Sequence, residues 1–135
     1  MQDIIQAALM LDQHALNWQL ELSPEDGRTF AQHCLSYNRS TRENVTALVE
    51  MVDQAVPPMN FGGDNPNNGK PCHYYRVGNE SSRVIYLLIY KGLAPKLDWI
   101  ALEKHLGHIA KECCVDEYWV TVNDDTKLIY RFWWD

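Results

Sequence analysis

The sequence contains no hydrophobic run that approaches the roughly 18 residues a membrane span needs. It also lacks a long basic stripe, because its 12 Lys and Arg residues are outnumbered by 18 Asp and Glu residues. Without such a stripe, little drives nonspecific binding to nucleic-acid phosphates. We therefore predict neither a membrane protein nor a nucleic-acid-binding protein.

Cysteine is sparse and never forms a C-x-x-C pair, since the four residues are Cys34, Cys72, Cys113 and Cys114. The first residues, MQDIIQAALMLDQ, carry an early Asp3 and no positive charge, unlike the start of a secretory signal. Unpaired thiols without an export signal indicate a cytoplasmic protein in a reducing compartment.

What the chain does have is the size and composition of one globular domain. It has 135 residues, of which 46% are hydrophobic and 22% charged, with a formal net charge of −6. A chain of this length buries roughly two thirds of its unfolded surface, so it can fold without disulfides or a structural metal. We predict a single domain over residues 1–135 and no cofactor.

Apolar residues at helical spacing predict three helices in the first half of the chain. The first runs to about Leu20, and its apolar side is formed by Ile4, Ile5, Ala8, Leu9, Ala15 and Leu16. The second starts at Ser23, which can cap free N–H groups, and Gly27 weakens it. The third starts at Ser40, another capping residue, and stops before Pro57.

Beyond these helices the hydrophobic period changes. Residues 57–71, PPMNFGGDNPNNGKP, keep no apolar periodicity and predict a long loop. The runs CHYYRVG and SRVIYLLIYKG then alternate as a β-hairpin does, and EYWVTVN and KLIYRFWWD predict a second hairpin. A helix from about Asp98 to Cys113 separates them. The fold class is therefore α+β: three N-terminal helices, then hairpin, helix and hairpin, with one antiparallel sheet of about four strands packed by helices.

Alternation also predicts strand environment and register. The run SRVIYLLIYKG is apolar on both faces, which is typical of a central strand. In the last hairpin, a three-residue loop at 124–126 places apolar residues of both strands on one face of the sheet. The predicted pairs are Val122 with Leu128, Val120 with Tyr130 and Tyr118 with Phe132. The other face then carries Trp119 opposite Arg131, where a cation–π contact is expected.

The helix at 98–113 offers the only spacing that suggests a metal. His105, His108 and Glu112 fall within about 60° of one another around the helix axis. Imidazole and carboxylate are ligands of zinc and iron. However, these side chains lie opposite the apolar stripe, so we predict a solvated helix face and no metal site.

Aromatic residues on the sheet give the main functional signal. Surfaces rich in Tyr, Trp and Arg are enriched in interface hot spots, and the candidates are Tyr86, Tyr90, Trp119, Arg131, Trp133 and Trp134. The competing interpretation places these side chains in the core. With the negative charge, they predict a small acidic interaction domain that binds and restrains or adapts a protein, as immunity proteins, inhibitors and antitoxins do. The partner would be a basic protein or a second copy of the chain.

The alternative is a small-molecule-binding domain or a small enzyme, with a pocket between sheet and helices near the 57–71 loop. The polar groups nearest that loop are His73, Tyr74, Tyr75 and Arg76, and Arg76 could hold an anionic ligand. No motif identifies an enzyme class. The glycine spacing of the loop does not match a phosphate-binding loop, and Cys72 and His73 would point to opposite faces of a strand.

Overall fold

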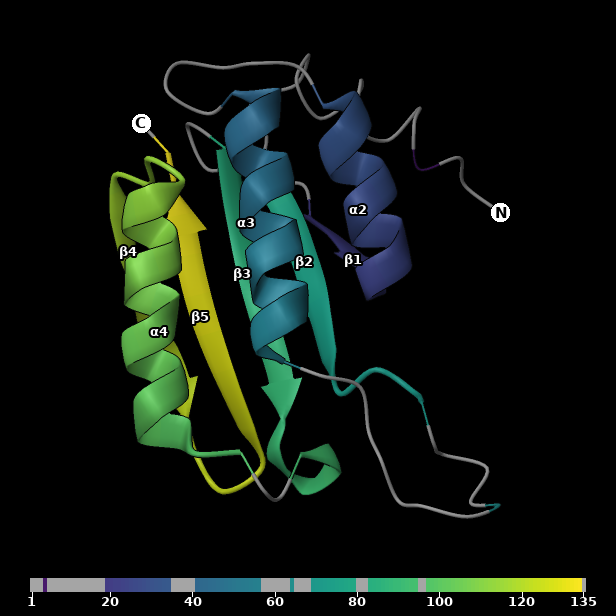
Figure 1. The fold of residues 1–135 in the computed structure, drawn as a ribbon, viewed down its shortest axis with the longest axis vertical. Coiled ribbons are helices and arrows are strands. Elements are labelled where there is room, and N and C mark those ends of the chain that lie inside the picture. The colour runs from purple at the N-terminus through teal and green to yellow at the C-terminus, as the bar shows by residue number, and fades with distance from the viewer. Residues whose placement is uncertain are drawn as a thin grey trace.

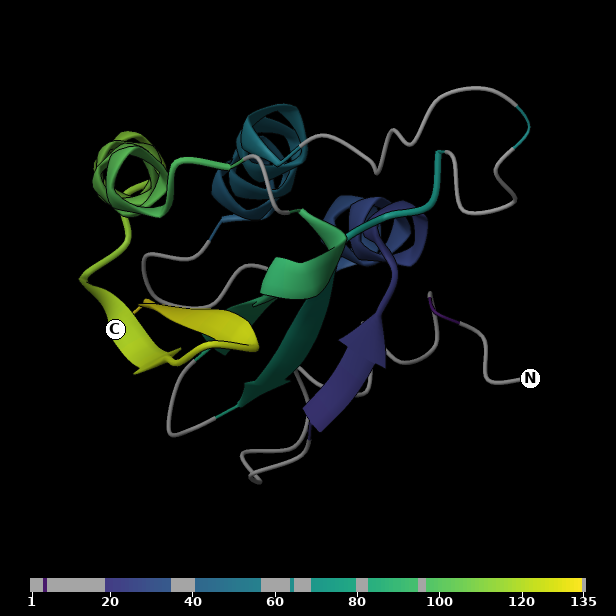
Figure 2. The same cartoon turned by 90° about the horizontal axis from the view of Figure 1, so that it is seen from below.

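The computed structural model describes residues 4, 19–34, 41–56, 64, 69–79, 83–94 and 97–134. Within this part of the chain, three α-helices cover one face of a five-stranded antiparallel sheet (Figures 1 and 2). The helical elements are α2 (Pro24–His33), α3 (Arg42–Ala55), η1 (Lys91–Leu93) and α4 (Trp99–Glu112). The strands are β1 (Gln19–Leu22), β2 (His73–Asn79), β3 (Arg83–Tyr90), β4 (Glu117–Asn123) and β5 (Lys127–Trp133).

The α+β class and the antiparallel sheet are confirmed, but the sheet has five strands and its helices are interleaved with them. The strand order is β1-β2-β3-β5-β4, and every neighbouring pair is antiparallel. Strand β3 is third of five, as its apolar faces predicted. Ile85, Leu87 and Ile89 are buried on the helix side, and Val84 and Leu88 are buried on the other side.

The extra strand is β1, whose first two residues were predicted as the end of the first helix. It pairs with β2 from Gln19 opposite Gly78 to Leu22 opposite Tyr75. Its four residues are held by that long-range pairing, which local hydrophobic spacing does not reveal. The rest of the predicted first helix lies outside the described residues, except Ile4, which is helical and packs against the core.

The helix starts follow the capping rules. Ser23 caps α2 as predicted, because its hydroxyl accepts a hydrogen bond from the Asp26 N–H at 3.2 Å. The cap of α3 is Thr41, and its hydroxyl accepts from the Asn44 N–H at 3.1 Å. The predicted cap, Ser40, lies outside the described residues. Asp98 caps α4, because its side chain accepts a hydrogen bond from the Ala101 N–H at 3.1 Å.

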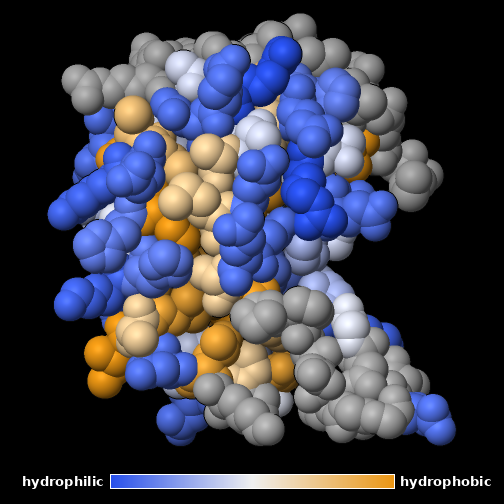
Figure 3. Space-filling view, viewed as in Figure 1, coloured by the Kyte–Doolittle hydropathy of each residue, from blue (hydrophilic) through white to orange (hydrophobic). Residues whose placement is uncertain are grey.

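The core lies between the helix layer and the sheet. Each helix contributes a buried stripe, with Phe30 on α2, Leu48 and Val52 on α3, and Leu106 and Ile109 on α4. The helix surface turned to solvent is largely hydrophilic, and hydrophobic residues show mainly along the strip between α3 and α4 (Figure 3). Among the described residues, no helix is both long enough and apolar enough to cross a bilayer.

The last hairpin has the predicted register at its far end and a bulge near its turn. Val120 lies opposite Tyr130, and Trp119 lies opposite Arg131. Val122, however, pairs with Ile129 and not with Leu128, because the register shifts between Val120 and Val122. This β-bulge inserts one residue into β4 and turns Val122 to the other face of the sheet.

Candidate functional site

A cavity of about 400 Å³ lies where the start of α2, the end of α3 and the start of β2 meet. This is the lower end of the helix layer in Figure 1. The volume falls in the range of small-molecule sites. The polar lining residues are Ser23, Glu25, Arg28, Asp53 and His73, and Pro24, Val56, Gly69 and Pro71 complete the wall.

Asp53 is the centre of a hydrogen-bond network at this cavity. One carboxylate oxygen, Oδ1, accepts from His73 Nε2 at 2.8 Å and from the Tyr75 hydroxyl at 2.7 Å. The other, Oδ2, accepts from Arg28 Nη1 at 2.7 Å. The Tyr75 hydroxyl also lies 3.1 Å from the Val49 carbonyl oxygen. The network therefore joins α2, α3 and β2 at one point.

The network keeps Asp53 ionised and Tyr75 protonated. Burial raises the pKa of Asp53, but the hydrogen bonds from His73, Tyr75 and Arg28 outweigh it, so the pKa lies below its usual 3.8. Burial, followed by the Asp53 charge, raises the pKa of Tyr75 well above 10. Tyr75 therefore stays a donor and Asp53 an acceptor across the physiological range.

His73 is oriented by Asp53 and has an unused nitrogen. A carboxylate oxygen can only accept, so the hydrogen must be on Nε2. The side chain is buried, with 3% of the residue exposed, and Nδ1 has no hydrogen-bond partner within the described part of the chain. An orphaned buried polar atom costs about 1–3 kcal/mol, and such an atom in a native protein calls for an explanation.

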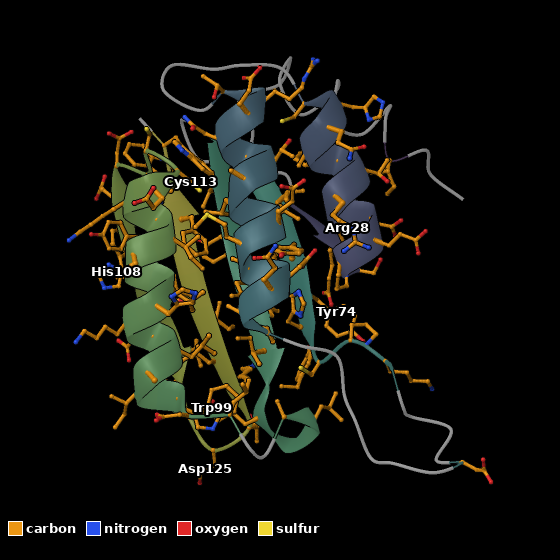
Figure 4. The ribbon with its side chains drawn as sticks, viewed as in Figure 1. Arg28, Tyr74, Trp99, His108, Cys113 and Asp125 are labelled. Atoms are coloured by element: carbon orange, nitrogen blue, oxygen red, sulfur yellow. The ribbon has the colours of Figure 1, made fainter. Side chains whose placement is uncertain are left out.

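Arg28 and Glu25 bring opposite charges to the same wall. Arg28 lies on α2 (Figure 4), and its side chain is 46% exposed. A guanidinium has five N–H donors. Only Nη1 makes a hydrogen bond within the described residues, and that bond goes to Asp53. Glu25, one turn earlier, is exposed and forms no ion pair there.

The sequence reasoning identified part of this site. Of its four ligand candidates, His73 lines the cavity and Tyr75 donates to Asp53. Tyr74 and Arg76 lie on the opposite sheet face, because neighbouring strand residues alternate. On that face, Nη2 of Arg76 lies 3.8 Å from Oε2 of Glu21.

Arg28 and Asp53 were missed, although Asp53 carried a signal. It follows Val49 by one helical turn, so it extends the apolar stripe of α3. A carboxylate in line with a buried stripe needs partners.

The proposed partner surface is found on the sheet face opposite α2, α3 and α4, here called the outer face. Arg131 lies between two tryptophans, with its guanidinium carbon 4.7 Å from the Trp119 ring centre and 5.8 Å from that of Trp133. Tyr86 lies opposite Arg131 in the neighbouring strand. Trp119 is 45% exposed, and Tyr90, on the same face, is 37% exposed.

Trp134 does not belong to the outer face. It is fully buried, and its Nε1 donates a hydrogen bond to the Cys113 carbonyl oxygen at 3.0 Å. It continues the alternation of β5, in which Leu128, Tyr130 and Phe132 are buried and the residues between them are not. Trp134 is therefore a core residue that ties the end of β5 to the end of α4.

The residues predicted to face solvent on α4 do so. His105, His108 and Glu112 are exposed, and His108 lies on the side of α4 away from α3 (Figure 4). Within the described ranges, no group of three or more His, Cys, Asp or Glu side chains is placed to hold a metal ion.

Three thiols are buried and have raised pKa values. Burial raises the pKa of Cys34 and of Cys113 to about 11. It also raises the pKa of Cys72, which precedes His73. A nucleophilic cysteine needs a lowered pKa, so none of these three is an activated nucleophile.

Comparisons with protein-family models, curated proteins and solved structures gave no match. What the protein does must therefore be inferred from its own residues.

Proposed function

We propose that the protein binds a small polar molecule in the cavity beside Asp53 and His73. One observation carries this proposal: the hydrogen-bonded cluster of His73, the ionised Asp53 and Arg28 lines a cavity of about 400 Å³. Binding sites commonly combine an apolar wall with a few convergent polar groups, as here.

The geometry favours binding over covalent catalysis. Nucleophilic catalysis needs a nucleophile within hydrogen-bond reach of its base. The nearest thiol, Cys72, is buried with a raised pKa. Ser23 also lines the cavity, but within the described residues no hydrogen bond joins its hydroxyl to His73. His73 and Asp53 are therefore assigned to ligand recognition.

A fragment screen by protein NMR tests the proposal. The library holds anionic, cationic, zwitterionic and neutral polar compounds, and the readout is the shift of individual backbone amides. Hits should move the amides of residues that line the cavity, such as Glu25, Gly69 and His73. If no fragment moves these amides, the proposal fails.

A matched pair of variants shows whether the hits use the imidazole. His73→Phe keeps an aromatic ring but removes both nitrogens, and it should abolish the cavity shifts. Tyr74→Phe changes the neighbouring ring on the outer face and should leave them unchanged. The rest of the amide spectrum reports whether each variant keeps the fold. Equal binding by His73→Phe and the unmodified protein would contradict a role for this histidine.

A second candidate function is binding of a protein partner through the outer face. The observation that favours it is the exposed Trp119 stacked on Arg131, because exposed Trp and Arg are the commonest hot-spot residues. The net charge of −6 favours a basic partner. A second copy of the chain is the other expected occupant.

Sedimentation and affinity purification separate these two occupants. Self-association that Trp119→Ala abolishes supports a second copy. A co-purified basic protein that is released by raised salt and by Trp119→Ala supports a different partner. A monomer that retains no protein removes this second candidate and leaves the cavity proposal intact.

A further inference from the structure

We infer that the ligand of the cavity is a free amino acid or a similar small zwitterion, in which an ammonium group and a carboxylate are attached to the same carbon. This inference rests on the proposed function and narrows it. It follows from two charged groups that line the cavity and keep hydrogen-bonding capacity within the described chain: the remaining N–H groups of Arg28 and the carboxylate of Glu25.

Arg28 provides the site for the ligand carboxylate. Its guanidinium is fixed by the 2.7 Å bond from Nη1 to Asp53, so its other N–H groups are held in a defined plane. A guanidinium matches a carboxylate with two parallel hydrogen bonds. His73, Tyr75 and Arg28 already occupy three of the roughly four acceptor positions of the Asp53 carboxylate.

Glu25 provides the site for the ammonium group. Its carboxylate is an acceptor with a negative charge on the cavity wall. An ammonium group has three donors and a positive charge, so it can form a charge-assisted hydrogen bond with this carboxylate. A neutral hydroxyl has one donor and no charge, so it would pair with Glu25 less strongly.

The balance of charge favours a zwitterion over a simple ion. The cavity wall holds one cation, Arg28, and two anions, Glu25 and Asp53. A dianionic phosphate would meet repulsion from both carboxylates, and a simple amine would leave the remaining N–H groups of Arg28 without an acceptor. A zwitterion offers a carboxylate to those N–H groups and an ammonium group to Glu25, and it adds no net charge to a partly desolvated space.

The rest of the wall selects the side chain of the amino acid. Pro24, Val56 and Pro71 give the cavity an apolar side. Contact with these residues favours an apolar amino-acid side chain, at about 0.8 kcal/mol for each methylene removed from water. The expected class is therefore an amino acid with an aliphatic side chain, and leucine is a suitable probe.

Three matched probes test the inference by titration calorimetry and NMR with the full chain. They are leucine, isocaproate, which is leucine without its ammonium group, and isoamylamine, which is leucine without its carboxylate. Leucine should bind at least tenfold more tightly than either analogue and should move the amides of the cavity. Equal or tighter binding of an analogue, or no binding of leucine, overturns the zwitterion assignment.

The two failures can be told apart. If leucine is inactive while other fragments move the cavity amides, only the zwitterion inference is lost. If no compound of any charge class moves them, the proposed function is lost as well.

Charge-neutral variants assign the two ends of the ligand. Arg28→Gln should weaken the binding of leucine and of isocaproate by about tenfold or more, which is the effect of losing a charge-assisted hydrogen bond. Glu25→Gln should weaken the binding of leucine, whereas the binding of isocaproate should be unchanged or tighter. The ion pair of Arg76 and Glu21, on the outer face, provides the matched controls Arg76→Gln and Glu21→Gln. Controls that weaken leucine as much as the cavity variants do would contradict the assignment.

Discussion

At the scale of single residues, Gly27 determines how closely α2 approaches the sheet. A Cβ atom added at this position would lie 2.7 Å from Cδ2 of Tyr75 and 3.1 Å from Cε2. Tyr75 is fully buried and its hydroxyl is bound to Asp53, so the ring has no room to move away. In the sequence this glycine predicted only a weaker helix, because local spacing does not show which ring will pack above it.

Gly27→Ala should therefore destabilise the protein, although alanine is the better helix former. The overpacking cost is about 1–3 kcal/mol and exceeds the gain of about 1 kcal/mol in helix propensity. Gly107→Ala on α4 is the matched control, because its nearest contact would be an ordinary 3.7 Å. Urea unfolding should show a lower free energy of unfolding for Gly27→Ala and a slightly higher one for Gly107→Ala. A gain for both would contradict close packing at Tyr75.

Asp53 should give the folded state a characteristic dependence on pH. Its pKa in the folded protein lies below the usual 3.8, because hydrogen bonds from His73, Tyr75 and Arg28 favour the charged form over burial. The stability that ionised Asp53 contributes is therefore complete above about pH 4. It is lost as the pH falls through the lowered pKa of the folded state.

Asp53→Asn tests this linkage. At neutral pH the variant should lose about 1–3 kcal/mol of unfolding free energy, because an amide has one acceptor oxygen for three donors. The difference in unfolding free energy between the variant and the unmodified protein should become smaller as the pH falls. Urea unfolding at a series of pH values measures it, and Glu50→Gln, on the exposed side of α3, should change little at any pH. A constant difference down to pH 2 would refute the linkage.

At the scale of elements, the β4–β5 hairpin shows what alternation predicts and where it stops. Away from the turn, the register was predicted by placing the apolar residues of both strands on one face. The pairing of Val120 with Tyr130 confirms that register. The bulge near the turn was not predicted, because it depends on polar contacts. The Thr121 hydroxyl donates to the Ile129 carbonyl oxygen at 3.2 Å. Asp124 folds the turn that follows.

Asp124 holds this turn with one carboxylate oxygen. Oδ1 accepts from the Thr126 N–H at 2.9 Å, the Lys127 N–H at 2.9 Å and the Thr126 hydroxyl at 2.8 Å. Asp124→Ala should therefore speed hydrogen exchange of the Thr126 and Lys127 amides. The neighbouring Asp125 makes none of these bonds, so Asp125→Ala is the control. Equal protection in both variants would show that the bulge alone sets the turn.

The same acceptor makes the turn sensitive to acid. Hydrogen bonds from the Thr126 and Lys127 amides and then from the Thr126 hydroxyl hold the pKa of Asp124 below its usual 3.8. The protection of these amides should therefore persist at neutral pH and decline as the pH falls through that lowered pKa. Asp124→Ala should remove this dependence.

At the scale of the whole molecule, the candidate site shows why sequence reasoning recovered only part of it. The hairpin and helix patterns predicted most elements, and His73 was placed near a pocket. Asp53 lies 20 positions from His73 and 25 from Arg28, and only the packing of α2, α3 and β2 brings them together. Strand β1 was missed for the same reason, because pairing with β2 holds it. Local pattern predicts elements, whereas contacts between elements create the site.

The two faces of the sheet should differ sharply in their sensitivity to mutation. Trp134→Ala removes a fully buried ring and its hydrogen bond to the Cys113 carbonyl, so it should cost about 3–5 kcal/mol. Trp119→Ala removes a ring that is 45% exposed and stacked on Arg131, so it should cost about 1 kcal/mol or less. Guanidinium unfolding of the two variants makes the comparison. Equal losses would mean that Trp119 is structural, and the outer face would then no longer qualify as a partner surface.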